Sequence, residues 1–282
     1  MTLRTLIDAP ALAELIGRND VFVVDCRSDL ADPTAAARAY AQGHIPGAVY
    51  ADLNHDLSDL TKAGLGRHPL PDAKLFSAVL SRWGWTPQMR VVAYDSANGA
   101  LAAARLWWML RLVGAREVAV LDGGWPAWHS AGLPVETAIP PREPTQVAVE
   151  FDPAQIIDTD ALLGMRQNIL LLDARVAPRF RGEVEPIDPV AGHVPGARNR
   201  PFSDNLGADG RFKPAAQLHA EFATLLGTQT AEDVVHMCGS GVTACHNLLA
   251  MEHAGLHDSR IYTPSWSGWI SDPQRPVATG PA

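Results

Sequence analysis

An internal duplication constrains this chain of 282 residues more than any other feature of its sequence. Four short segments return in the same order after about 140 to 150 further residues, a regularity that chance rarely produces. The pairs are FVVDCRSD and LLLDARVA at residues 22–29 and 170–177, GHIPGA and GHVPGA at 43–48 and 192–197, VVAYDSANGA and VVHMCGSGVTA beginning at 91 and 234, and GGWPAW and PSWSGW at 123–128 and 264–269. The chain is therefore predicted to contain two similar domains.

A proline-rich stretch marks the boundary between the two copies. The segment PVETAIPPREPTQVAVEFDP, which begins at residue 134, has no helical periodicity and is typical of a semi-extended linker. We therefore predict a first domain over residues 1–135, a linker over 136–150 and a second domain over 151–282. Both domains have an ordinary size for an independent fold.

Each copy alternates short apolar runs with helical patterns. The expected strands are 21–25, 91–95 and 118–122 in the first copy and 169–173, 233–237 and 259–263 in the second, and the clearest expected helices are 71–84, 100–114 and 242–255. Apolar strands that alternate with helices predict an α/β fold in which a parallel sheet carries helices on both faces. Ligands bind such sheets beyond the carboxyl ends of the strands.

Composition excludes several classes of function. A formal net charge of −8 gives no broad basic surface for nucleic acid or anionic lipid, and no apolar stretch reaches the roughly 20 residues that span a bilayer. Asp8 and Glu14 interrupt the region where a secretory signal needs an apolar core. Three cysteines are too few for a disulfide framework, so we expect a cytoplasmic protein with reduced thiols.

The segment that begins at Cys238 carries the strongest chemical signal. An expected strand ends at Met237, the glycine-rich loop CGSGVTA follows, and a helical pattern begins directly after it. Backbone N–H groups in such a loop and the positive end of the helix favour an anion, including a thiolate. Cys238 is therefore the predicted nucleophile, whereas Cys245 on the helix and Cys26 on a strand are expected to pack in the core.

The duplication provides an internal control for this assignment. The position in the first copy that matches Cys238 is Asp95, in the segment DSANGA. A carboxylate cannot perform thiol chemistry, so only the second copy is expected to be catalytic.

Taken together, these segments resemble a known family, the tandem-domain rhodanese-like sulfurtransferases. The resemblance covers nearly the whole chain and rests on GHIPGA, LDGGWPAW, DAR, RFRGEVEP, GHVPGA and CGSGVTACH. It implies two rhodanese-like α/β domains and a cysteine persulfide that forms only in the second.

Within the family, CGSGVTA is similar to the loop of the 3-mercaptopyruvate group, whereas the animal thiosulfate group carries an Arg-Lys pair where this chain has Gly239 and Ser240. The resemblance implies transfer of sulfur from 3-mercaptopyruvate through Cys238 to a thiol or cyanide, with thiosulfate as the alternative donor. It implies no cofactor and no metal, and it makes a dithiol protein such as a thioredoxin an expected acceptor.

The resemblance also assigns roles outside the cysteine itself. Arg179 matches the arginine that binds the anionic group of the donor, and Arg181 could share that role. His68 falls in a segment whose histidine lies close to Ser240 and could relay a proton during C–S cleavage. The remaining residues expected at the donor site belong to the loop: Gly239, Gly241, Val242 and Thr243.

Two positions depart from the pattern of the 3-mercaptopyruvate group. Asp188 stands where a second arginine is expected, and Asn54 stands where the carboxylate partner of the histidine is expected. By contrast, Asp173 and Arg175 have counterparts in the inactive copy, so we expect them to form an ion pair that stabilises the fold.

Two other functions fit the sequence less well than sulfur transfer. Cysteine-dependent phosphatases need an arginine six residues after the cysteine, and here that residue is Ala244. A binding module without activity would not need Cys238 and its intact loop. The sequence leaves the oligomeric state open.

Overall fold

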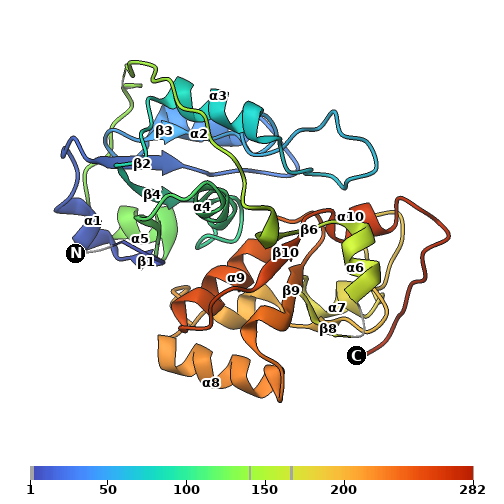
Figure 1. Cartoon of the computed structure of the whole chain (residues 1–282). Coiled ribbons are helices and arrows are strands. Elements are labelled where there is room, and N and C mark those ends of the chain that lie inside the picture. The colour runs from blue at the N-terminus through green and yellow to red at the C-terminus, as the bar shows by residue number, and fades with distance from the viewer. Residues whose placement is uncertain (1–2, 140, 166–167, 282) are drawn as a thin grey trace. The chain divides into compact units, whose positions relative to one another are not determined.

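The computed structural model describes residues 3–139, 141–165 and 168–281 (Figure 1). The chain forms two compact units, each built on a five-stranded sheet. Unit 1 holds the residues up to Asp59, Leu70–Asp152 and Asp209–Arg211, and unit 2 holds Leu60–Pro69, Pro153–Ala208 and the residues from Phe212 onward.

Unit 1 has the strand order β1-β5-β4-β2-β3, and every pairing in it is parallel. Its elements are β1 (Leu6–Ile7), α1 (Ala9–Ala13), β2 (Val21–Asp25), α2 (Ala35–Gln42), β3 (Val49–Tyr50), α3 (Ala73–Trp83), β4 (Arg90–Tyr94), α4 (Ala103–Leu112), β5 (Val118–Leu121) and α5 (Gly124–Ser130).

Unit 2 repeats this topology as β6-β10-β9-β7-β8, again with parallel pairings only. Its elements are η1 (Pro153–Gln155), β6 (Ile156–Ile157), α6 (Thr159–Met165), β7 (Leu170–Asp173), α7 (Ala177–Phe180), β8 (Arg198–Asn199), η2 (Phe202–Asn205), α8 (Ala215–Leu226), η3 (Ala231–Asp233), β9 (Val234–Met237), α9 (Ala244–His253), β10 (Arg260–Tyr262) and α10 (Ser265–Trp269).

Burial of the central strands explains their sequences. All four residues of β5, β7 and β9 are buried, as a strand requires when helices cover both faces of its sheet. The predicted α/β fold with two parallel sheets is confirmed, and the predicted strands and long helices lie within a few residues of their expected bounds. Gly114 and Gly255, which follow α4 and α9, have φ values of 79° and 78°, the conformation that ends a helix on glycine.

The predicted structural ion pair occurs in both units with the same geometry. An arginine two residues beyond a strand's terminal aspartate donates to that carboxylate and to the carbonyl oxygen that precedes the H-x-P-G-A turn. These contacts are Arg27 to Asp25 at 2.6 Å and Gly43 at 2.7 Å, and Arg175 to Asp173 at 2.7 Å and Gly192 at 2.8 Å. The pair fastens the turn to the end of the strand, so its presence in both copies is a property of the fold.

The segment predicted as a linker lies along helix α3 of unit 1. The backbone N–H of Thr145 donates to the carbonyl oxygen of Ser81 at 2.9 Å, and that of Val149 donates to the hydroxyl of Ser77 at 3.0 Å. Residues as far as Asp152 consequently belong to the first compact unit.

A second segment lies in the first copy by sequence but packs in unit 2. Residues 60–69 belong to unit 2, where the backbone N–H of Arg67 donates to Ser267 Oγ at 3.0 Å and Ser271 Oγ donates to the carbonyl oxygen of Gly64 at 3.1 Å. Gly66 has φ of 92°, and a Cβ atom there would lie 2.6 Å from the carbonyl oxygen of Pro264. Only glycine fits this close approach.

Within the residues described, no helix combines the length and the apolar character needed to cross a membrane.

Candidate functional site

Cys238 lies where strand β9 ends, at the start of the loop that leads into helix α9. The backbone N–H of Gly241 donates to Cys238 Sγ at 3.1 Å, and Gly241 has φ of 79°, which favours glycine. The loop therefore turns a backbone donor toward the sulfur. This contact is strongest when the sulfur is a thiolate, because charge strengthens a hydrogen bond.

The beginning of helix α10 holds the backbone of the cysteine loop. Ser265 Oγ accepts from the N–H of Cys238 at 3.1 Å, and the N–H groups of Trp266 and Ser267 donate to the carbonyl oxygens of Cys238 and Gly239, both at 2.9 Å. Ser265 has φ of 52°, an uncommon conformation for a residue with a side chain. Sequence analysis did not identify this serine, although its counterpart in the first copy, Gly124, has a similar φ of 56°.

His68 and Ser240 lie in direct contact within unit 2. Their Nδ1 and Oγ atoms are 2.8 Å apart, and both residues are buried. The histidine reaches the cysteine loop because residues 60–69 belong to this unit. A buried imidazole that is hydrogen-bonded to a hydroxyl can move a proton to or from that oxygen.

Arg179 also lies beside the loop, but two carboxylates already bind it. Its Nη2 atom donates to Glu185 Oε1 at 2.7 Å and to Asp188 Oδ2 at 3.0 Å. A Cβ atom at Gly239 would lie 3.7 Å from both terminal nitrogens of Arg179. The arginine expected to bind the donor is therefore placed next to the residue that follows the nucleophile.

Arg67 is a second guanidinium at the same place, and sequence analysis missed it. Its Nη2 atom would lie 3.0 Å from a Cβ atom at Gly239, and its Nη1 atom donates to Asp188 Oδ1. The loop residues Gly239 and Ser240 are neutral, as the sequence states, but the surroundings of the loop are not. Two cations reach it from other segments of unit 2.

The pKa values of the two acidic partners of these arginines shift in opposite directions. Burial alone would raise the pKa of Glu185, but hydrogen bonds from Arg179 and from the N–H groups of Asp188 and Ile187 outweigh it, and the pKa of Glu185 is lowered. Burial raises the pKa of Asp188 despite the opposing charge of Arg67. Glu185 is therefore the more firmly ionised of the two.

Other expected site residues occupy different surroundings. Arg181 donates to Glu183 at 2.7 Å in an exposed pair. Val242 is buried, and Thr243 precedes α9 without a side-chain hydrogen bond to the helix. Cys245 is fully buried and its Sγ atom lies 3.4 Å from the carbonyl oxygen of Gly241, which agrees with the expected packing role.

In unit 1, the loop that corresponds to the Cys238 loop surrounds the side chain of Asp95. The buried carboxylate of Asp95 accepts hydrogen bonds from five backbone N–H groups, at distances between 2.8 and 3.1 Å. The donors belong to Ala97, Gly99, Leu101, Ala102 and Ala103. The loop geometry thus suits an anion in the first copy as well, and the five N–H groups oppose the burial that raises the pKa of the Asp95 carboxyl.

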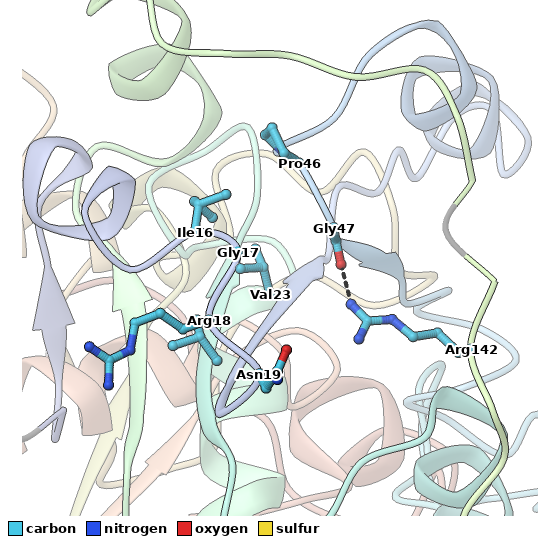
Figure 2. A pocket seen from close by; sticks show the side chains of 9 residues that line it. Ile16, Gly17, Arg18, Asn19, Val23, Pro46, Gly47 and Arg142 are labelled. Carbon is cyan, nitrogen blue, oxygen red and sulfur yellow. Dashed lines mark hydrogen bonds between the residues drawn. The ribbon is translucent and has the colours of Figure 1, made fainter.

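A separate hollow of about 240 Å³ lies in unit 1, where Arg142 donates to the carbonyl oxygen of Gly47 (Figure 2). It is lined by Ile16, Gly17, Arg18, Asn19, Val21, Val23, Pro46, Gly47 and Arg142. These residues include no thiol, carboxylate or imidazole, so the hollow offers none of the groups needed for nucleophilic or acid-base chemistry.

Known proteins resemble this chain over nearly its whole length. Residues 8–131 and 158–272 match the family described as "Rhodanese-like domain". The "Probable 3-mercaptopyruvate sulfurtransferase" of Pseudomonas aeruginosa is 48% identical, over 99% of this chain and 100% of that protein, and the "Putative thiosulfate sulfurtransferase SseB" of Mycobacterium tuberculosis is 41% identical, over 99% and 98%. Among solved structures, 3-mercaptopyruvate sulfurtransferase from Leishmania major superposes with a TM-score of 0.84 at 31% identity, over 96% of this chain and 76% of that one.

Proposed function

The chain belongs to the rhodanese-like family, and on that premise we propose that it is a sulfurtransferase that uses 3-mercaptopyruvate as its donor. Sulfur passes through a persulfide on Cys238 to a thiol or to cyanide. The observation that carries the proposal is the contact between His68 Nδ1 and Ser240 Oγ, two residues after the nucleophile. After mercaptopyruvate gives up its sulfur, the remaining pyruvate enolate needs a proton on carbon, which such a relay can supply. After thiosulfate gives up its sulfur, the remaining sulfite needs no proton on carbon.

The proposed first half-reaction breaks one bond and forms another. The Cys238 thiolate attacks the sulfur of mercaptopyruvate, an S–S bond forms, and the C–S bond breaks with its electron pair moving to carbon. The resulting enolate of pyruvate takes up a proton, for which the relay of Ser240 and His68 is the proposed route. The loop N–H groups, including that of Gly241, stabilise the anionic persulfide.

The second half-reaction regenerates the thiol. A nucleophilic acceptor attacks the outer sulfur of the persulfide, and the Cys238 thiolate leaves. Cyanide yields thiocyanate, and a dithiol protein such as a thioredoxin yields a persulfide that its second thiol resolves. The three cysteines, all among the described residues, are thiols and not disulfides, which fits the proposed action in a reducing, cytoplasmic compartment.

A comparison of donors tests the choice of substrate. We expect kcat/KM with cyanide as acceptor to be at least about tenfold higher for mercaptopyruvate than for thiosulfate, which corresponds to about 1.4 kcal/mol. The proton relay serves only the first donor. A preference for thiosulfate would contradict the proposal and support the alternative activity.

Arg179 is proposed to bind the carboxylate of the donor. Substitution of Arg179 by glutamine should lower kcat/KM for mercaptopyruvate by about 10- to 100-fold, mainly through KM, because the lost charge-assisted contact is worth about 1.5 to 3 kcal/mol. Arg181→Gln should change kcat/KM much less, since Arg181 lies in an exposed pair with Glu183. Steady-state kinetics of both variants checks this, and the reverse order of effects would transfer the role to Arg181.

A further inference from the structure

Four charged side chains form a cluster next to the cysteine loop: Arg67, Arg179, Glu185 and Asp188. Arg179 binds Glu185 at 2.7 Å and Asp188 at 3.0 Å, and Arg67 binds Asp188. The Glu185 and Asp188 side chains are only 4% and 2% exposed, whereas that of Arg67 is 29% exposed. The cluster contains two cations and two anions. Glu185 also lies 3.6 Å from Arg175, which pairs with Asp173, so the charges balance when all six groups are ionised.

Asp188 occupies the centre of this cluster. Its Oδ1 atom meets Arg67 and its Oδ2 atom meets Arg179, so a single carboxylate bridges both guanidinium groups. Glu185 has a different role, because it receives Nε and Nη2 of Arg179 and also accepts from the N–H of Asp188 at 3.1 Å. Glu185 thus orients Arg179 and the chain that carries Asp188.

The bridged guanidinium groups face the reactive loop. A Cβ atom at Gly239 would lie 3.0 Å from Arg67 and 3.7 Å from Arg179. An anionic group attached to a sulfur that approaches Cys238 would meet the same two arginines. Two guanidinium groups around one carboxylate are a strong arrangement for binding a planar anion.

We propose that Asp188 is an internal carboxylate that occupies the donor's anionic position between Arg67 and Arg179, and that Arg67 is the second arginine of the donor site. The identity of the donor rests on the proposed function, whereas the anion site itself does not. When the donor binds, its carboxylate replaces that of Asp188 on the two arginines. The exchange substitutes one negative charge for another, which suits a monocarboxylate better than the dianion thiosulfate.

The test compares two alkylating reagents of similar size, one charged and one neutral. Iodoacetate carries a carboxylate and iodoacetamide does not, so the ratio of their rates at Cys238 reports how strongly the site attracts an anion. The ratio is followed by mass spectrometry of the peptide that holds Cys238 in the full-length protein. It needs no donor and no turnover.

Asp188→Asn should raise the ratio of iodoacetate to iodoacetamide rates about five- to tenfold, because it removes a negative charge and keeps the shape of the side chain. Arg67→Gln should lower the ratio by a similar factor, and Arg67→Lys should stay near the wild-type value. Asp272→Asn is the matched control, since Asp272 pairs with Arg275 at the surface and its side chain is 44% exposed.

The same variants are then assayed with mercaptopyruvate, where Asp188→Asn should lower KM by a similar factor. Unchanged ratios in both Asp188→Asn and Arg67→Gln would overturn the inference, and so would an equal acceleration of both reagents, which indicates only a loosened structure. If the ratios of iodoacetate to iodoacetamide rates shift as expected but the enzyme does not use mercaptopyruvate, the anion site is supported and the proposed donor is contradicted.

Discussion

Replacement of Cys238 by serine should lower sulfur transfer by at least about 1,000-fold, because a hydroxyl group is not ionised at neutral pH and cannot carry a persulfide. Cys26→Ser and Cys245→Ser should keep most of the activity. Burial raises the pKa of the Cys26 thiol well above its ordinary value, so this residue is not a thiolate at neutral pH. Cys245 is fully buried on helix α9.

Mass spectrometry gives a direct measurement of the same assignment. Treatment with the donor in the absence of an acceptor should add about 32 Da to the peptide that contains Cys238, and cyanide should remove this mass. The three single variants provide the controls. Added mass on the Cys245 peptide, or turnover by Cys238→Ser, would contradict the assignment of the nucleophile.

Substitution of Asp95 by alanine should destabilise the protein by about 3 to 5 kcal/mol, the largest effect on stability that we expect in unit 1. Five backbone N–H groups converge on this buried carboxylate, and its removal leaves them without their acceptor. Urea unfolding followed by tryptophan fluorescence measures the change.

Asp29→Ala is the matched control for this prediction. Asp29 also accepts from two backbone N–H groups, those of Ala31 and Asp32, but it lies in an exposed turn where water can replace it. Its substitution should change the unfolding free energy far less. Equal effects of the two substitutions would show that burial of the Asp95 carboxylate is not what makes its hydrogen bonds important.

The fold was largely predictable because its signals are local or repeated. Apolar runs such as residues 170–172 give buried parallel strands, and the paired motifs give the same strand order twice. The repeated Asp-x-Arg pattern predicted a structural role for Asp173 and Arg175, and the ion pair is present in both units. Periodicity and duplication carry this information without any knowledge of distant contacts.

The surroundings of the loop were less predictable because they depend on residues distant in sequence. No sequence motif marks Arg67 as a neighbour of the cysteine loop. It lies beside Gly239 in a segment where Gly66 allows the chain to approach Pro264 closely. Ser265 looks like an ordinary small residue in PSWSGW, yet its hydroxyl accepts from the N–H of Cys238. In both cases the decisive fact is a tertiary contact.

The placement of residues 60–69 in unit 2 has a consequence for the order in which the protein is made. His68 and Ser240 are 172 positions apart, so the histidine leaves the ribosome long before the loop that it contacts. Unit 1 can close its sheet around Asp95 while residues 60–69 still lack the contacts that hold them. The contact between His68 and Ser240 therefore forms only when synthesis is almost complete.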